Sequence, residues 1–310
     1  MRVVRRVDHV VVYVSDPQIL FRALTERLGL PAGTPVTRLP GFRSGLVVLG
    51  NVFLEVIRPA PGRRVGVPLD QGVFGLGLEP EPLETAIAEL DRRSIPHTMP
   101  FADPTSPPSG GAFGFDPTSV PPYTVVMIGG LLGDQVLARS AARTPVAVAR
   151  WSTRMLVRFW GNRVGDRMFQ RITLTPSVFI TEFHPQIRAA VDPDRMRGLL
   201  HDAGGGRIGL TGVRELVIGV PNVEGEIERW QALLEPAPAL GVGHWQLPSG
   251  PAIRLQSSPG LSQRLICEIS SIDAAAAFLR EQELLGDSTD DELQIAPAAL
   301  AGLDIRLVGA

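Results

Sequence analysis

Two polar side chains stand inside apolar segments near the start of the chain. His9 interrupts the segment 7–14 (VDHVVVYV), and Glu55 interrupts the segment 51–57 (NVFLEVI). Both segments are rich in β-branched residues, which is typical of strands. An imidazole and a carboxylate buried in a mostly apolar sheet are costly unless each has a partner. We therefore expect His9 and Glu55 to pair with each other, with water or with a cation.

Strand alternation predicts which neighbours share a face with these two residues. The expected sets are Val7, His9 and Val11 on one strand, and Phe53, Glu55 and Ile57 on the other. If the two strands are neighbours in a sheet, His9 and Glu55 point into the same cavity. Direct contact would then be a hydrogen bond of about 2.7–3.2 Å.

Composition excludes several classes of enzyme. All 30 basic residues are arginine, so no lysine exists to form a Schiff base or to hold a nucleotide phosphate. Pyridoxal-phosphate enzymes and P-loop hydrolases are excluded on that ground. The net charge of −2 gives no basic field for nucleic acid. The single cysteine, Cys267, excludes an internal disulfide and fits a reducing cytoplasm.

Other motifs have structural interpretations. Gly204, Gly206 and Gly209 satisfy G-x-G-x-x-G, but a helix is expected before them and a strand after them. A dinucleotide site needs the order strand, turn, helix, so we interpret the glycines as a turn between domains. Three further histidines show no metal-ligand spacing and are expected at the surface or in hydrogen bonds: His97, His201 and His244.

The elements around His9 and Glu55 follow the order strand, helix, three strands. The same order starts again near Gly72, Val213 and Arg264. The segment 213–222 (VRELVIGVPN) aligns without a gap with 7–16 (VDHVVVYVSD). Four copies of one βαβββ unit are therefore predicted, in an α+β fold.

The four modules are expected to form two paired-module domains. Modules 1 and 2 occupy 1–186, a linker spans 187–212, and modules 3 and 4 occupy 213–310. An insertion of about 133–171 interrupts the second module between its last two strands, and its pattern predicts a helix over 146–160. We expect this insertion to pack at the mouth of the N-terminal domain.

Three short motifs resemble those of the vicinal oxygen chelate superfamily. They are Asp8-His9-Val10, Phe53-Leu54-Glu55 and the strand FITEF at 179–183. That superfamily includes glyoxalase I, extradiol dioxygenases, and the fosfomycin- and bleomycin-resistance proteins. The first half looks most similar to its glyoxalase-like domain proteins. The resemblance covers nearly the whole chain as architecture, whereas the motifs lie only within 7–184.

The resemblance implies a divalent metal held by the first and fourth strands of paired modules. Imidazole nitrogen and carboxylate oxygen suit Fe, Mn, Zn, Co or Ni. In the first module these positions are His9 and Glu55. Ligand atoms would lie about 2.0–2.2 Å from the metal, as for zinc.

The second module contributes less to this implied site. Its first-strand position falls near Val73 or Phe74, so it offers no ligand there. On its fourth strand two registers compete, one matching Glu55 with Thr181 and the other with Glu182, and the motif favours Glu182. The implied metal ligands are His9, Glu55 and Glu182.

The second half departs from the pattern. Glu215 replaces the histidine and Arg254 replaces the glutamate, while the fourth module offers Ile266 and Asp304. Extradiol dioxygenases place their ligands in this half, so ring cleavage of that type is disfavoured. We expect a degenerate partner domain.

The function that the resemblance implies is a metal-dependent lyase or isomerase acting on a small oxygen-rich substrate. Glu182 or His184 would be its catalytic acid or base. We expect a cytoplasmic protein without nucleic-acid partner or membrane span, and a homodimer stays open. The alternatives are a metal-free binding protein of the bleomycin-resistance kind and a metal-independent biosynthetic enzyme on the same fold.

Overall fold

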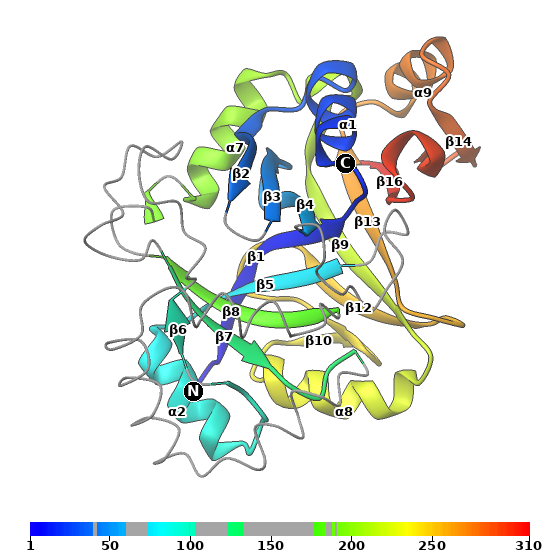
Figure 1. Ribbon diagram of the computed structural model, residues 1–310. Helices are drawn as coiled ribbons and strands as arrows, with labels where there is room; N and C mark the ends of the chain where they lie inside the picture. The colour runs from blue at the N-terminus through cyan, green and yellow to red at the C-terminus, as the bar shows by residue number, and fades with distance from the viewer. Residues whose placement is uncertain are drawn as a thin grey trace.

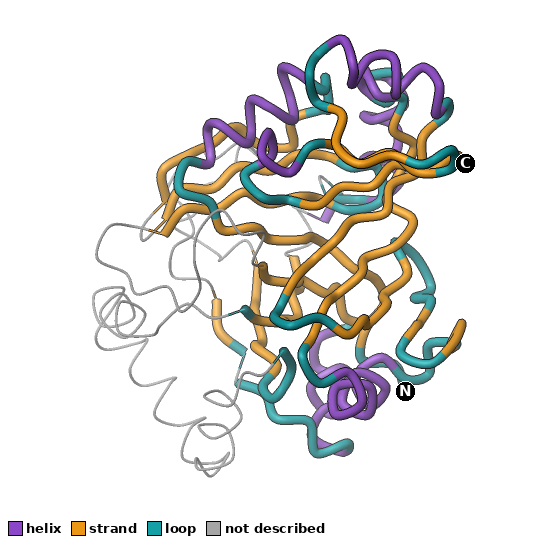
Figure 2. Tube along the Cα trace, turned by 90° about the vertical axis from the view of Figure 1, so that its right-hand side faces the viewer, coloured by secondary structure: helices purple, strands orange, loops and turns teal. Residues whose placement is uncertain are grey.

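A computed structural model describes most of the chain. The described residues are 1–39, 42–59, 74–98, 100–102, 123–132, 176–183, 188–189 and 191–310. They contain two eight-stranded sheets, one in each half (Figure 1). Figure 2 shows helices on two opposite sides of the molecule with the strands between them.

The N-terminal sheet is built from two βαβββ units. The first comprises β1 (Val4–Tyr13), α1 (Pro17–Arg22), the π-helical turn η1 (Ala23–Arg27), β2 (Ala32–Leu39), β3 (Phe42–Val48) and β4 (Phe53–Pro59). The second comprises β5 (Phe74–Pro80), α2 (Leu83–Arg92), β6 (Phe101–Ala102), β7 (Tyr123–Ile128) and β8 (Ser177–Phe183). The strand order is β2-β3-β4-β1-β5-β8-β7-β6. The first strands of the two units, β1 and β5, therefore lie side by side, and they are antiparallel.

The C-terminal sheet repeats this arrangement. Its third unit comprises β9 (Leu210–Val220), α8 (Val223–Leu234), β10 (Ala239–Gly241), β11 (His244–Trp245) and β12 (Ala252–Ser257). Its fourth comprises β13 (Ser262–Ile269), α9 (Ile272–Glu281), β14 (Leu285–Ser288), β15 (Glu292–Ile295), the 3-10 turn η3 (Pro297–Leu300) and β16 (Asp304–Gly309). The order β10-β11-β12-β9-β13-β16-β15-β14 matches the first sheet strand for strand. The prediction of four βαβββ modules in paired domains is confirmed.

Short polar residues begin the helices α1, α8 and α9, in three of the four units. The side chains of Asp16, Asn222 and Ser271 each accept a backbone N–H of the first turn. Such N-caps satisfy donors that a helix start leaves free. Alternate strand residues then pack on the helices, and the opposite face of each sheet, here called the inner face, carries the polar groups.

The expected linker is largely described by the structure, whereas the expected insertion is not. The expected linker 187–212 contains a helix, α7 (Pro193–Asp202), and a 3-10 turn, η2 (Gly206–Ile208). The sequence places the insertion 133–171 between β7 and β8, but it lies outside the described residues, as do its expected helix and its expected place at the domain mouth. Within the described residues no helix is long and apolar enough to cross a membrane.

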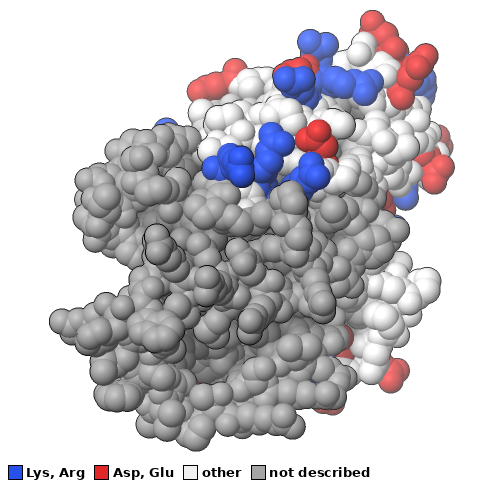
Figure 3. Space-filling view, viewed as in Figure 1, with Lys and Arg blue, Asp and Glu red and all other residues white. Residues whose placement is uncertain are grey.

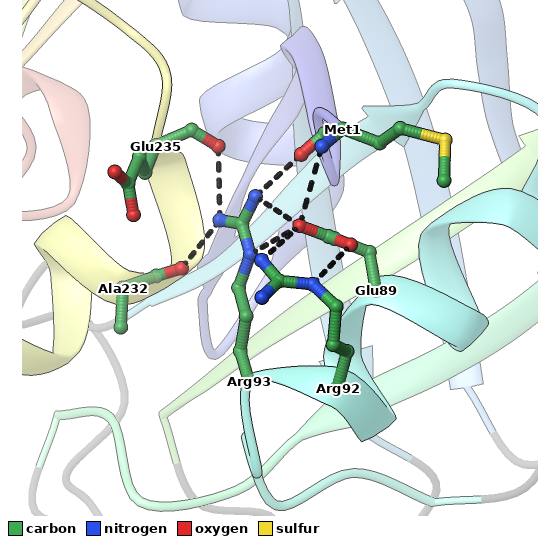
Figure 4. A network of polar contacts seen from close by, with 6 residues as sticks. All are labelled: Met1, Glu89, Arg92, Arg93, Ala232 and Glu235. Atoms are coloured by element: carbon green, nitrogen blue, oxygen red, sulfur yellow. Dashed lines mark hydrogen bonds and ion pairs between the residues drawn. The ribbon is translucent and has the colours of Figure 1, made fainter.

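The two halves are joined by polar contacts as well as by a common core. Arg93 donates to the carbonyls of Ala232 and Glu235 at the end of α8, at 2.7 and 2.9 Å, and to the carbonyl of Met1 (Figure 4). The buried carboxylate of Glu89 holds the same guanidinium at 2.7 Å. A cation at a helix C-terminus satisfies its last carbonyls and favours its dipole, so Arg93 fixes α2 against α8.

Glu89 collects several positive groups at this joint. Arg92 and then Arg93 donate hydrogen bonds that hold the pKa of Glu89 far below its usual range, against the effect of desolvation. On the other side of the molecule, the Asn51 side chain pairs with both backbone groups of Val213, at 2.7 and 2.9 Å. Side chains of the N-terminal half therefore form hydrogen bonds with backbone groups of the C-terminal half at two places.

Surface charge gathers over the outer strands of the N-terminal sheet. Figure 3 shows basic side chains grouped on this part of the described surface. Arg38, Arg43 and Arg58 are exposed and lie directly opposite one another on β2, β3 and β4. Opposed like charges on a sheet are mildly destabilising, and water screens them at an exposed position.

Candidate functional site

A β-bulge in β1 decides which side chains reach the inner face of the N-terminal sheet. Val7 pairs with Leu78 and His9 pairs with Gly77, so Asp8 is an extra residue opposite no partner. The bulge turns both Asp8 and His9 to the inner face and leaves Val7 in the helix-side core. The expectation that Val7 shares a face with His9 is therefore wrong, because regular alternation does not hold across a bulge.

His9 is held on three sides. Its Nδ1 lies 2.6 Å from Asp8 Oδ2, and its Nε2 lies 3.6 Å from Glu55 Oε2. Its ring packs on Phe179 with centroids 5.2 Å apart. The ring also occupies the space where Gly77 has no side chain, since a Cβ there would lie 2.3 Å from His9 Cε1. The sequence expectation that His9 and Glu55 face one another matches this geometry.

Glu55 is fixed from the other side. The Ser44 hydroxyl on β3 donates to Glu55 Oε1 at 2.5 Å, and Oε2 faces His9. Leu54 and Val56 pack in the helix-side core, so Glu55 is on the inner face. The separation of 3.6 Å from His9 is too long for a direct hydrogen bond. It is shorter than twice the usual metal–ligand distance of about 2.0–2.2 Å, so one ion could contact both atoms.

A buried arginine, Arg6, holds the Asp8 carboxylate that contacts His9. Arg6 is 2% exposed and donates to Glu79 through Nε and to Asp8 Oδ1 through Nη2 at 3.2 Å. The same Nη2 donates to the carbonyl of Val191 at 3.1 Å. Val191 and Met196 pack with Phe53 in a small apolar cluster, so the segment that leads into α7 covers part of the inner face.

The electrostatics of this group favour a cation at His9. Burial alone would lower the pKa of His9, but the Asp8 hydrogen bond and the charges of Asp8 and Glu55 outweigh burial and the repulsion of Arg6. The pKa of His9 is therefore raised above its usual value. Arg6 pairs with Asp8 and Glu79, so of the charged groups that act on the imidazole two are carboxylates, Asp8 and Glu55, and one is a cation, Arg6.

The structure does not bring Glu182 to this pair. Glu182 Oε1 accepts the backbone N–H of Leu83 at 3.1 Å, at the start of α2, and lies 3.9 Å from Arg188. Ile180, two residues earlier, is in the helix-side core, so Glu182 leaves the inner face. Glu182 therefore faces the start of α2, where the helix needs an acceptor, and its role as a third ligand stays a sequence prediction.

Thr181 takes the inner-face position instead. Thr181 is 2% exposed, and its hydroxyl has no hydrogen-bond partner. Gly77 is the residue of β5 that lies opposite His9. His184 and Val73 lie outside the described residues, so the alternative catalytic histidine keeps its place as a sequence prediction. Among the described residues no group of three His, Cys, Asp or Glu side chains could hold a metal ion.

Solved structures resemble this architecture over its whole length. The 2,3-dioxygenase LapB from Pseudomonas sp. KL28 matches with a TM-score of 0.55 at 9% identity, covering 100% of this chain and 93% of that one. A hypothetical protein from Staphylococcus aureus matches with a TM-score of 0.51 at 8% identity, covering 98% and 99%. Homoprotocatechuate 2,3-dioxygenase from Arthrobacter globiformis matches with a TM-score of 0.51 at 10% identity, covering 99% and 80%.

These dioxygenases are members of one superfamily. The chain has the vicinal oxygen chelate fold. No protein-family model matches the sequence, and no curated protein sequence matches it. The resemblance seen in the sequence is thus confirmed at the level of fold, while identities of 8–10% carry no residue roles across.

The second vicinal oxygen chelate domain has a different inner face. Glu215 lies where β1 carries His9, and Arg254 lies where β4 carries Glu55. Arg254 Nη2 donates to Glu215 Oε2 at 2.7 Å, and His244 Nε2 lies 2.8 Å from Glu215 Oε1. A guanidinium therefore stands beside the carboxylate here, where the N-terminal domain places an imidazole opposite a carboxylate.

The sequence interpretation does not predict the roles of Asp8 and Ser44. Asp8 appears there only as part of the motif Asp8-His9-Val10, because Asp8 and Ser44 become partners of His9 and Glu55 through the bulge and the β3–β4 register. The alternation GLGLE at 75–79 is a readable signal, because a glycine inside a strand often marks close approach of another group.

Proposed function

We propose that the N-terminal domain is a divalent-metal-dependent enzyme of the glyoxalase-like kind, a lyase or isomerase acting on a small oxygen-rich substrate. The observation that carries the proposal is the placement of His9 Nε2 and Glu55 Oε2 3.6 Å apart on the inner face, with Asp8 on the other imidazole nitrogen. A histidine that ligates a metal usually donates its second ring N–H to a carboxylate. Asp8 supplies that partner.

The surrounding residues fit a bound cation in charge and in shape. The excess of carboxylates that raises the pKa of His9 favours a cation at the same point. When bound, a divalent ion would polarise a substrate carbonyl and stabilise an oxyanion. Ser44 fixes the Glu55 carboxylate, Gly77 gives the imidazole room, and Phe179 packs against the imidazole ring. On the second module, Gly77 and the buried hydroxyl of Thr181 would leave room beside this pair for a substrate.

A second candidate is a metal-free small-molecule binding protein. It is favoured by the donor set, because the described part of the chain gathers one imidazole and one carboxylate and no third ligand. In that case the protonated imidazole of His9 would donate to an oxygen of the bound molecule. The same two residues would then serve recognition, without chemistry on the ligand.

Metal analysis separates the two candidates. Untagged protein is incubated in turn with Fe, Mn, Zn, Co and Ni, passed through a desalting column, and assayed for bound metal. We expect close to one ion per chain, lost in His9→Ala and Glu55→Gln and kept in Glu182→Gln, since Glu182 caps α2. Failure of every metal to stay bound would refute the enzyme proposal in its metal-dependent form and favour the binding protein.

A further inference from the structure

The inner face of the C-terminal sheet presents two arginines across one buried valine. Val217 on β9 pairs with Arg254 on β12 and with Arg264 on β13, so the three side chains form one row. Val217 is 3% exposed, and its neighbours Ala252 and Ile266 are also buried. The two guanidinium groups therefore stand on either side of a small apolar floor.

Each arginine is anchored by a carboxylate of its own. Arg254 Nη2 donates to Glu215, and Arg264 Nε donates to Asp304 Oδ2, both at 2.7 Å. Gln294 and Arg306 hold the other oxygen of Asp304 at 2.8 and 2.9 Å. These contacts fix both arginine side chains in place before any ligand arrives, which lowers the entropy that binding must overcome.

The anchors leave many donors unused. A guanidinium has five N–H groups, and each of these arginines uses one nitrogen in a described hydrogen bond. Arg254 Nε is buried without a partner in the structure. The side chains of Arg254 and Arg264 are 42% and 36% exposed, so N–H groups other than the buried Arg254 Nε can be reached by a solute. A buried charged donor without an acceptor points to a missing oxygen atom at this place.

Other charged groups face the same surface and have partners. Glu292 on β15 contacts Arg306 on β16 at 3.2 Å, and His244 on β11 contacts Glu215. Glu268 lies outside the row, four residues beyond Arg264 along β13. The carboxylates of Glu215, Asp304 and Glu292 on this face therefore already have partners, whereas N–H groups of Arg254 and Arg264 do not.

We propose that Arg254 and Arg264 bind the carboxylate of a small organic anion on the inner face of the C-terminal domain. The planar fork of a guanidinium matches a carboxylate in two parallel charge-assisted hydrogen bonds. Arg264 offers the parallel pair Nη1 and Nη2, because its Nε is held by Asp304, and Arg254 adds Nη1, because its Nη2 is held by Glu215. The site needs no metal and is independent of His9 and Glu55.

Calorimetric titration tests the proposal with defined probes. The full-length protein is titrated at low ionic strength with acetate, succinate, citrate and inorganic phosphate, and with succinamide as the uncharged analogue of succinate. We expect saturable binding of at least one carboxylate and none of succinamide. Arg254→Gln and Arg264→Gln should each weaken that binding about tenfold or more, because each removes charge-assisted hydrogen bonds. Phosphate binding alone would overturn the assignment to a carboxylate.

Matched variants make the result specific. Arg280→Gln removes the same charge from an exposed residue of α9 with no ion pair in the described structure, and it should leave binding unchanged. His9→Ala should also leave it unchanged, which separates this site from the N-terminal one. If Arg254→Gln fails to fold, Arg254→Lys is used instead, because lysine keeps a positive charge beside Glu215. It should still weaken binding, because an ammonium lacks the planar guanidinium's additional N–H donors. Absence of any carboxylate binding, or equal loss in Arg280→Gln, would overturn the proposal.

Discussion

Replacing Gly77 by alanine tests how His9 is positioned. The new Cβ would lie 2.3 Å from His9 Cε1, 2.6 Å from Nδ1 and 2.8 Å from Nε2. Carbon atoms in contact are normally about 3.5–4.0 Å apart, so the ring would have to retreat by about 1.2 Å. That retreat breaks the 2.6 Å contact with Asp8. Gly77 has no positive φ, so the change tests space alone and adds no backbone strain.

The expected cost is about 1–3 kcal/mol of unfolding free energy, as for other overpacked positions. It is measured by urea denaturation of Gly77→Ala beside Gly198→Ala, whose Cβ meets nothing within 4 Å and which lies inside α7. The control should be neutral or slightly stabilised, since alanine favours a helix. Metal retention should fall in Gly77→Ala and not in Gly198→Ala.

A double-mutant cycle decides whether His9 is the cause. In a His9→Ala background the clash is gone, so Gly77→Ala should cost little, with a coupling energy of about 1–3 kcal/mol. An equal cost in both backgrounds would refute the reasoning, because the strain would then lie elsewhere on β5. A negligible cost in the wild-type background would show that the ring is not confined as described.

Three further predictions follow from other parts of the molecule. Arg93→Ala should lower the unfolding free energy by about 2 kcal/mol, because it removes charged hydrogen bonds to the end of α8, whereas the exposed Arg92→Ala should have a smaller effect in the same denaturation assay. Burial raises the pKa of Cys267 to about 12, so the native thiol should not react with a disulfide reagent near pH 8 and should react fully once the protein is unfolded in guanidinium chloride. In protein freed of metal with EDTA, the raised pKa of His9 should add stability that is complete below about pH 6.5 and is lost as pH rises through the folded-state pKa; a pH series of denaturation curves would show this slope, and His9→Ala should lack it.

The repeated units are legible in the sequence because their signals are local. An apolar strand followed by a helix with one apolar face recurs four times, three of the helices begin with a polar capping residue, and the ungapped match of 7–16 with 213–222 aligns β1 with β9. The first and fourth strands of a unit are neighbours in the sheet, so recognising the unit is enough to place His9 on β1 near Glu55 on β4.

The details of the site depend on register, which a single sequence does not fix. The bulge at Asp8 moves the residues before it on β1 to the opposite face from the one that regular alternation predicts, and no residue type near Asp8 indicates a bulge. The choice between Thr181 and Glu182 depends on the same kind of one-residue difference, and the side chain of Glu182 accepts the Leu83 N–H at the start of α2. A short motif around Glu182 contains no information about a hydrogen bond to Leu83, which lies 99 residues away in the sequence.

One hydrophobic cluster runs through both halves of the chain. It includes Val7 and Leu54 from the first sheet together with Ile253 and Leu307 from the second. Neither half can therefore open without exposing apolar surface of the other, and Arg93 and Asn51 would lose their partners at the same moment. The consequence is thermodynamic cooperativity between the duplicated domains: calorimetric and van't Hoff enthalpies should agree for a single melting transition, and either half expressed alone should lack a stable native state.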